Sequence, residues 1–255
     1  MSIESYRQYR RILKALPSNG QYVDYGWGGL PENVDEMWMP YTLMFGEFAR
    51  ELANVMNEFT RYTHQLAAWR DLVAPLDNRK KLDAIVDFIN PVATVAINMP
   101  YVIRSRFIFA AAQLSHQANR AKLGVSWKDE FPLDGEVYFA AADAHAKEWK
   151  RYKGLKKKIE NIGAKDYQHA TNDFRNAYNH RFSPRIELGI TQVVKRHVKP
   201  DGSVSYGFGG VYPLQLTCIV TLLEAQCQHC YQAFEAFKLL IKEQEEAIKS
   251  YSAGT

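Results

Sequence analysis

The stretch Phe45-Gly46-Glu47-Phe48-Ala49-Arg50-Glu51-Leu52-Ala53-Asn54-Val55-Met56-Asn57-Glu58-Phe59 decides the fold class of this chain. Its apolar residues recur at spacings of three and four, which is the period of one face of an amphipathic α-helix. The pattern extends on both sides and predicts a first long helix from Val34 to about Leu72. Such a helix has to bury its apolar face against other elements, so the sequence favours a packed helical protein.

Further stretches of the chain carry the same helical period. We predict a second helical stretch from Asn78 to about Leu123, bent or broken at Pro91 and Pro100, because proline removes a backbone donor and clashes with the preceding turn. Helical character is expected to return from Glu136 to Ile162, to pause at Gly163, and to resume from Lys165 to about Arg181.

The period changes between Ile186 and Val211, where apolar residues alternate with polar ones around the turn sequence Lys199-Pro200-Asp201-Gly202. This pattern predicts a β-hairpin at about residues 186–211. A last apolar stripe predicts a C-terminal helix from about Pro213 to Ser250. The fold class is therefore mainly α, a helical bundle with a β-hairpin insertion before its C-terminal helix.

The domain organisation follows from the same reading. Residues 1–33 begin with a short basic helix and continue as an irregular lead-in rich in glycine and aromatic residues. Residues 34–255 are predicted to form a single helical domain. The window from Ala84 to Ile103 is apolar but contains Asp87 and two prolines, so we predict a buried helix there and no membrane span.

Composition places the chain among soluble globular proteins. Of its 255 residues, 47% are apolar and 24% charged, with no long low-complexity tract. The net charge of +4 permits a polyanionic partner but does not require one. Only three cysteines occur, and the first residues show no apolar segment followed by a small-residue cleavage site. We therefore expect a reducing, cytoplasmic location.

One segment carries a possible chemistry, Asn172-Asp173-Phe174-Arg175-Asn176-Ala177-Tyr178-Asn179-His180-Arg181-Phe182-Ser183-Pro184. Arg175 offers a permanent cation whose planar fork of donors suits phosphate oxygens, and His180 can exchange protons near neutral pH. On a helix, Asn176 and His180 share a face, so that the amide could orient the imidazole. The supporting candidates are Asp173, Asn179 and Arg181. Such a set could hold and cleave a phosphodiester without a metal or cofactor.

A single copy of this segment supplies only one imidazole. Attack by a 2′-hydroxyl of RNA on the adjacent phosphate benefits from one group that takes a proton and another that gives one. Two copies that face each other across a dimer axis would supply both. The sequence therefore favours a homodimer with RNA as its substrate.

The segment Arg175-Asn176-Ala177-Tyr178-Asn179-His180 resembles the signature of the HEPN superfamily, an arginine, a polar residue, three variable residues and a histidine. The resemblance implies an all-helical, HEPN-like protein with metal-independent ribonuclease activity at a composite site between two protomers. Arg175, Asn176 and His180 would be its catalytic residues. It further implies products with a 2′,3′-cyclic phosphate and a 5′-hydroxyl, kinship with toxin–antitoxin or antiphage systems, and a neutralising protein partner.

The alternative is a non-catalytic helical dimer that binds a partner or acts as a regulator. In that interpretation Arg175 pairs with Asp173 or Glu187, and His180 is a cation at the C-terminal end of a helix, where the helix dipole favours positive charge. Both interpretations are compatible with the sequence.

Two further groups of residues have competing interpretations. A basic run could form a track for RNA, with Tyr152 stacking on a base, or it could be a solvated helix face. The run consists of Lys150, Arg151, Lys153, Lys156, Lys157 and Lys158. Cys227-Gln228-His229-Cys230 could bind a metal, but no complementary set is apparent. Core cysteines are the favoured interpretation, and we predict no metal site.

Overall fold

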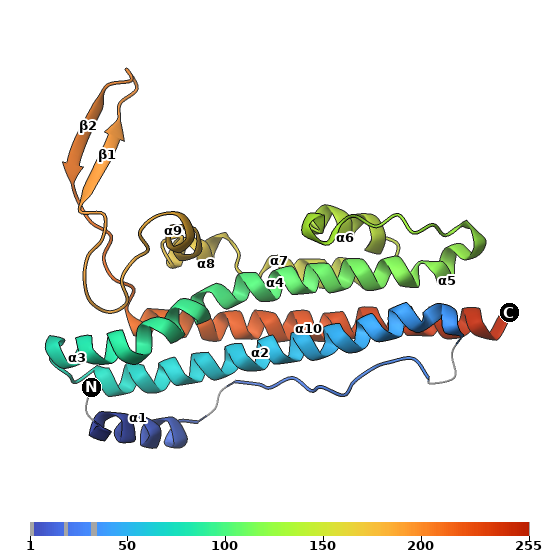
Figure 1. The fold of residues 1–255 in the computed structure, drawn as a ribbon, viewed down its shortest axis with the longest axis horizontal. Helices are drawn as coiled ribbons and strands as arrows, with labels where there is room; N and C mark the ends of the chain where they lie inside the picture. Colours follow the sequence, from blue (N-terminus) through green and yellow to red (C-terminus); the bar gives the residue numbers. More distant parts are fainter. Residues whose placement is uncertain (1–2, 18–19, 32–34, 255) are drawn as a thin grey trace. The chain divides into compact units, whose positions relative to one another are not determined.

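The computed structural model describes residues 3–17, 20–31 and 35–254 and is mainly α-helical (Figure 1). In this part of the chain the only sheet is a two-stranded antiparallel hairpin, β1 (Val194–Val198) and β2 (Val204–Phe208), which directly precedes the C-terminal helix. The predicted mainly α fold with a hairpin insertion is therefore confirmed.

The chain divides into two compact units built from interleaved segments. Unit 1 comprises Met1–Gly20, Phe59–Met99 and Ala164–Ala225, and unit 2 comprises Gln21–Glu58, Pro100–Gly163 and Gln226–Thr255. Three long helices contribute one part to each unit, namely α2 (Met39–Val73), α4 (Asn90–Ala118) and α10 (Leu216–Gly254). The single domain expected over residues 34–255 stays a prediction.

The first long helix forms where the apolar period places it. It follows the short 3-10 turn η1 (Glu36–Trp38), at which the side chain of Asp35 accepts a hydrogen bond from the backbone of Met37 (2.8 Å). The predicted start at Val34 lies outside the described residues. A short helix near the N-terminus, α1 (Ile3–Ala15), is confirmed as well.

The second helical stretch is interrupted at two places among its described residues, before Pro91 and at Asn119, where α4 gives way to the short α5 (Arg120–Leu123). Helix α3 (Asn78–Ala84) leads into a π-helical segment, η2 (Ile85–Ile89), and α4 then continues through Pro100. The expected break at Pro100 is therefore absent, and the alternative of a bend there stays a prediction. The ring of Pro91 would clash with the carbonyl four residues earlier, that of Asp87, and the wider π turn lies at that position.

One helical run, Asn78–Ser126, is long and apolar enough to cross a membrane by length and composition, with a hydropathy of 1.3 and 39% of its most apolar window buried. Core helices of soluble proteins satisfy the same criterion, so this finding only weakly indicates a membrane span. The buried helix expected at residues 84–103 stays a prediction.

Two helices that the sequence predicts as continuous are each divided. Residues 136–162 form α6 (Phe139–Ala146) and α7 (Tyr152–Glu160), because the intervening backbone N–H groups of Lys150 and Arg151 donate to the carboxylate of Glu243 instead of continuing a helix (both 2.9 Å). Residues 165–181 form α8 (Lys165–Ala170) and α9 (Phe174–His180). Asn172 and Asp173 lie between them with φ angles of 52° and 51°, in the left-handed region that ends a right-handed helix.

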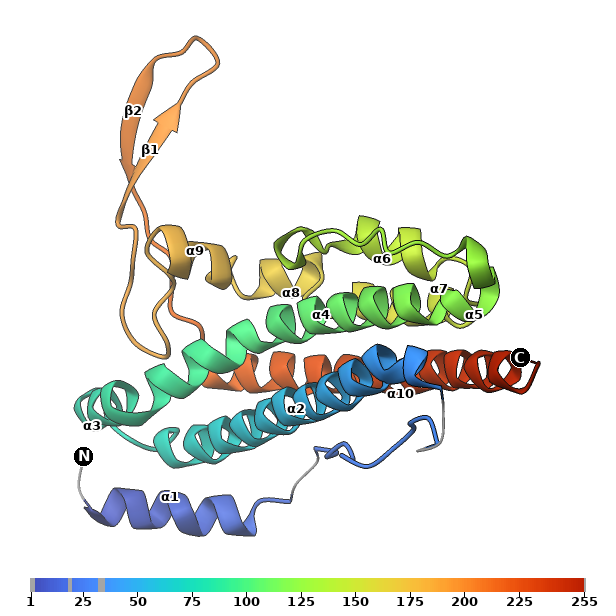
Figure 2. The ribbon, with the colours of Figure 1, turned by 45° about the vertical axis from the view of Figure 1, so that its right-hand side comes forward.

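The hairpin has the predicted turn, and the structure adds the register of its two strands. Val194 pairs with Phe208 and Val198 with Val204, and Gly202 provides the positive φ of the turn (79°). The two segments that flank the hairpin pair with each other through an isolated bridge between Ile186 and Leu214, and both of these side chains are buried. In both views the strands project away from the helices of that unit (Figures 1 and 2).

The core of unit 1 is centred on aromatic rings that join α1 to the C-terminal part of α2. Tyr9 stacks on Trp69 with ring centroids 4.1 Å apart, and Phe88 lies against the other side of the cluster at 5.3 Å from Trp69. His64 of α2 also contacts the carbonyl of Leu13 (3.2 Å). Buried aliphatic residues of α4 and α10, such as Ile97 and Leu223, complete this core.

Unit 2 has a core of its own that includes an apolar cluster and a buried polar chain. Trp27 makes edge-to-face contacts with Phe45, Phe234 and Phe237 at centroid distances of 5.1, 5.3 and 5.9 Å. Gln244 of α10 accepts a hydrogen bond from the hydroxyl of Tyr41 (3.1 Å) and donates one to Ser115 (2.9 Å). All three of these polar side chains are fully buried.

A pair of histidines in unit 2 predicts a stability change with pH. The rings of His116 and His145 lie 4.8 Å apart, and burial followed by the charge of His116 lowers the pKa of His145 below its usual 6.5. The unfolded chain then binds the proton more readily than the folded one, so protonation favours unfolding. We expect the free energy of unfolding to decrease as the pH falls below 6.5 and through the lowered pKa of the folded protein.

Urea denaturation over a series of pH values measures this decrease. His145→Phe keeps the ring and removes the titration, so its unfolding midpoint should depend less on pH in this range than that of the wild type. Identical pH profiles for both proteins would contradict the assignment.

Candidate functional site

The residues predicted as catalytic lie on the outer face of α9, in unit 1. The inner face of this helix carries Phe174 and Ala177, which are buried, and Tyr167 of α8 anchors the segment by donating a hydrogen bond to the carbonyl of Ile97 (2.9 Å). Because residues three apart share a helix face, burial of Phe174 and Ala177 turns the polar side chains outward. Arg175, Asn176, Asn179 and His180 are all exposed.

Arg175 and His180 leave α9 in different directions. At about 100° per residue, two positions five apart on an α-helix differ in direction by about 140°. Arg175 also interacts with other groups of the chain. Within one protomer the guanidinium and the imidazole therefore point to different sides of α9, with Asn176 and Asn179 between them.

Asp173 organises the polar face of α9. Its carboxylate accepts hydrogen bonds from Gln168 of α8 (2.8 Å) and Asn176 (3.0 Å) and forms an ion pair with Arg181 (3.2 Å). The hydrogen bonds from Gln168 and Asn176, together with the charge of Arg181, lower the pKa of Asp173. The network thus joins α8 to both ends of α9 and favours the ionised form of this carboxylate.

The network changes the expected role of Asn176. Its amide nitrogen donates to Asp173, whereas the sequence suggested a hydrogen bond to the imidazole of His180. The two acidic residues named in the non-catalytic interpretation each have identified partners. Asp173 pairs with Arg181, and Glu187 accepts from the backbone N–H of Leu216 (2.7 Å) and lies 3.8 Å from Lys81.

Substitutions at Asp173 should separate its backbone conformation from its side-chain contacts. Asp173→Ala places an unfavourable residue in the left-handed region and removes the network, so we expect the free energy of unfolding to fall by about 1–2 kcal/mol. Asp173→Asn should cost less, because asparagine tolerates that backbone conformation and still accepts hydrogen bonds. Urea denaturation followed by circular dichroism measures both changes, and equal losses for the two variants would contradict this account.

The basic run lies in unit 2, on α7 and the turn before it. Some of its side chains bond to other residues of the chain. Lys156 forms an ion pair with Asp143 (2.7 Å), and Lys158 donates to Gln232 (3.0 Å). Lys153 and Lys157 are exposed. The expectation that Tyr152 stacks on a base is wrong, because its ring is buried and its hydroxyl donates to Asp143 (2.8 Å).

Two of the cysteines are core residues, as the favoured interpretation predicted. Cys227 and Cys230 are buried on α10, and burial raises the pKa of the Cys230 thiol well above its usual value. Among the described residues no group of three or more His, Cys, Asp or Glu side chains could hold a metal ion.

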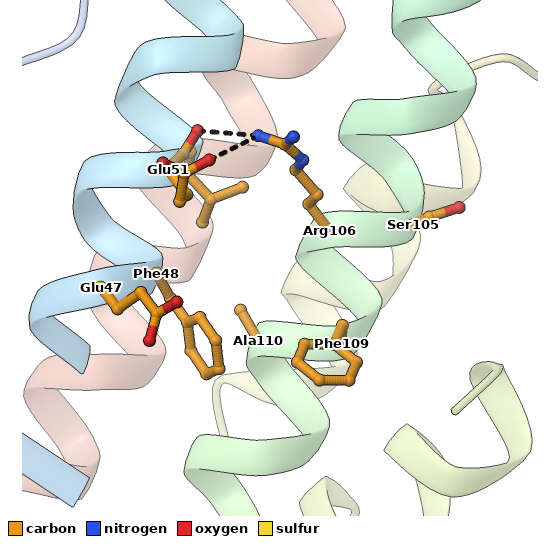
Figure 3. Close-up of a pocket in the computed structure, with 8 residues that line it drawn as sticks. Glu47, Phe48, Glu51, Ser105, Arg106, Phe109 and Ala110 are labelled. Carbon is orange, nitrogen blue, oxygen red and sulfur yellow. Dashed lines mark hydrogen bonds and ion pairs between the residues drawn. The ribbon is translucent and has the colours of Figure 1, made fainter. Parts of the chain in front are cut away.

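A shallow pocket of about 350 Å³ lies in unit 2 between α2 and α4 (Figure 3). Arg106 points from α4 toward Glu51 of α2 and donates to its carboxylate (3.1 Å) and its backbone carbonyl (3.4 Å). The remaining lining is largely apolar and includes Phe48 and Phe109, whose rings meet edge to face. We assign no chemistry to this pocket, because the guanidinium and the carboxylate at its rim already pair with each other.

The position of the hairpin was predicted, but the different chemistry of its two faces was not. In the sequence, Val194, Arg196 and Val198 alternate, as do Val204, Tyr206 and Phe208, and the register places these six side chains on one face. The signal was available in this period of two. It was missed because the hairpin was interpreted only as an insertion.

Comparisons with known proteins identify no relative, since no family model, curated protein or solved structure matches the chain.

Proposed function

We propose that this protein is a metal-independent endoribonuclease of the HEPN type, whose active site combines the α9 segments of two protomers. The observation that carries the proposal is the exposure of Arg175, Asn176 and His180 on one short helix whose opposite face is buried. A substrate as large as RNA can reach these side chains only if they are exposed, so their exposure meets a requirement of the proposal.

The angular separation of Arg175 and His180 favours a composite site. Because these two side chains leave α9 in different directions, one helix alone presents a guanidinium on one side and an imidazole on the other. A second α9 related by a two-fold axis would place its own guanidinium and imidazole across the same space. The shared site then contains two cations for the phosphate and two imidazoles for proton transfer.

The proposed reaction uses these groups in distinct roles. One His180 takes the proton of the 2′-hydroxyl, whose oxygen attacks the adjacent phosphorus, and the bond from phosphorus to the 5′-oxygen breaks. The other His180 gives a proton to that leaving oxygen. Arg175 binds the non-bridging oxygens and stabilises the charge that develops on them. The products are a 2′,3′-cyclic phosphate and a 5′-hydroxyl.

Asp173 and Asn176 are assigned to positioning and phosphate contact. The carboxylate of Asp173 accepts one N–H of the Asn176 amide, which leaves the second N–H of that amide to donate to a phosphate oxygen. Arg181, paired with Asp173, and the exposed Asn179 line the same region. The proposal includes a cytoplasmic location and a neutralising protein partner, as expected for a nuclease of a toxin–antitoxin or antiphage system.

The test is cleavage of single-stranded RNA by the purified chain in the presence of EDTA, with analysis of the product ends. We expect cleavage that EDTA does not abolish and fragments with 2′,3′-cyclic phosphate and 5′-hydroxyl ends. If a range of RNAs remains intact in the presence of a protein shown to be dimeric, the non-catalytic, partner-binding interpretation replaces this proposal.

A further inference from the structure

The hairpin of unit 1 presents an apolar and aromatic face to solvent. Its register sets Val194 opposite Phe208, Arg196 opposite Tyr206 and Val198 opposite Val204. Side chains alternate between the two faces of a strand, so all six lie on the same face. Phe208 is 97% exposed and Tyr206 is 70% exposed. The strands project away from the helices of their unit in both views (Figures 1 and 2).

Such a face is unusual for a protein that acts alone. A two-stranded hairpin is marginally stable in water by itself, and a contiguous exposed apolar patch generally marks an interaction site. Here the bridge between the buried Ile186 and Leu214 joins the segments that flank the hairpin, which leaves the aromatic face available to a ligand.

The positive charge of the hairpin favours a polyanion as its ligand. Lys195, Arg196 and His197 follow one another on β1, and Lys199 begins the turn. Asp201, the acidic residue of this segment, already accepts hydrogen bonds from the backbone and the hydroxyl of Ser203 (2.9 and 2.7 Å). Of these residues, Arg196 lies on the aromatic face opposite Tyr206, whereas Lys195 and His197 lie on the other face. A cation beside stacking aromatic rings is a combination that binds single-stranded nucleic acid.

A second copy of the chain fits this surface less well. Edge-to-edge pairing of two β1 strands would bring Lys195 and Arg196 of one copy against the same cations of the other. Like charges on opposed strands destabilise such pairing, and lysine on an edge strand is a common means of preventing it.

We propose that the aromatic face of the hairpin binds single-stranded RNA, with bases stacked on Tyr206 and Phe208 and a phosphate held by Arg196. This inference rests on the proposed function for the identity of the polyanion, and it names the element that would hold the substrate of that site. Residues 181–193 connect α9 directly to β1, so RNA bound on the hairpin stays tethered near the motif helix.

The test uses the full chain carrying His180→Ala, so that the RNA remains intact, and measures the fluorescence anisotropy of a labelled single-stranded RNA of mixed sequence. Tyr206→Ala and Phe208→Ala should each weaken binding roughly 5- to 100-fold, as expected for the loss of one base stack. The matched control is Tyr138→Ala in unit 2, because Tyr138 is 69% exposed and lies off the hairpin. It should leave the affinity unchanged.

Charge reversal provides an independent measurement. Arg196→Glu should weaken binding far more than Lys153→Glu, which makes the same change in net charge on α7. Arg196→Ala should also lower the slope of log affinity against log salt by about one. Duplex RNA hides the faces of its bases, so it should compete poorly with the single strand.

Several outcomes would overturn the proposal. One is unchanged affinity in both aromatic variants, and another is equal loss with Arg196→Glu and Lys153→Glu, which would indicate general electrostatics or the basic run of α7. If the aromatic variants instead turn a dimer into a monomer without loss of RNA binding, the hairpin face binds a second copy. Circular dichroism confirms that each variant is folded.

These outcomes are independent of the proposed nuclease activity. RNA binding that depends on Tyr206 and Phe208, found in a chain whose wild type does not cleave RNA, would support the hairpin proposal and reject the nuclease. Cleavage of RNA by the wild type, together with normal RNA binding by both aromatic variants, would support the nuclease and reject the hairpin proposal.

Discussion

RNA cleavage is expected to fall by about a hundredfold to ten-thousandfold when His180 is replaced by alanine, because the site loses the group that takes and gives the protons. His180 is exposed at the end of α9, and the buried contacts of that helix come from Phe174 and Ala177. The substitution should therefore leave the fold unchanged. Initial rates of cleavage of a labelled RNA in EDTA measure the effect, and circular dichroism and thermal denaturation verify the fold.

Matched variants show whether the loss is specific. His169→Ala removes another exposed histidine, on the neighbouring helix α8, and should retain wild-type activity. Arg175→Ala should lower cleavage to a similar extent as His180→Ala. Arg175→Lys should recover part of the rate, since lysine keeps the charge but lacks the planar fork that binds two phosphate oxygens. Full activity in either alanine variant would show that α9 does not carry the active site.

Mixing experiments test the composite site. If each active site needs His180 from both protomers, refolding wild-type chains with an excess of His180→Ala chains should lower activity with the square of the wild-type fraction. A site contained within one protomer would lose activity in simple proportion. This experiment distinguishes a dimeric active site from a dimer whose protomers act separately.

The largest stability change is expected for Gln244→Ala in the core of unit 2. The substitution leaves the buried hydroxyls of Tyr41 and Ser115 without their partner and creates a cavity at a fully buried position. Both effects act together, so the free energy of unfolding should fall by about 3–5 kcal/mol. Urea denaturation followed by tryptophan fluorescence measures this loss.

Further variants separate the cavity from the unpaired hydroxyls. Gln244→Leu fills most of the space but leaves the hydroxyls of Tyr41 and Ser115 without a hydrogen-bond partner. It should therefore still lower the free energy of unfolding by about 2 kcal/mol or more. Combining Gln244→Leu with Tyr41→Phe and Ser115→Ala removes these unpaired hydroxyls. The triple variant should therefore be more stable than the sum of the single changes predicts. Strict additivity would show that the three side chains do not act as one network.

The local pattern of the sequence was sufficient to predict the main elements. The apolar period in Phe45–Phe59 specified the first long helix, and the change of period with the Pro-Asp-Gly turn specified the hairpin and its position before the C-terminal helix. These features are local, because a period of 3.6 or of 2 is set by residues that are neighbours in the sequence. The break expected at Pro100 is absent because helix interiors tolerate proline when surrounding contacts compensate.

The candidate site was predicted less completely. Composition and spacing singled out Arg175, Asn176 and His180, and the structure places all three on the exposed face of α9. They did not reveal that Asp173 lies in the left-handed region and fixes Asn176 through a network that includes Gln168. Nor did they reveal that Tyr152 is buried, because that depends on contacts with Asp143.

The sequence by itself determined the helical class, the hairpin and the residues with suitable chemistry, because these follow from the residue types and their short-range order. The tertiary structure decided which side chains face solvent and where helices end. Residues 165–181 have a helical period throughout, yet Asn172 and Asp173 adopt left-handed conformations where Asp173 meets Gln168 and Arg181. Contacts between residues brought together by folding outweigh helix propensities that differ by less than about 1 kcal/mol per residue.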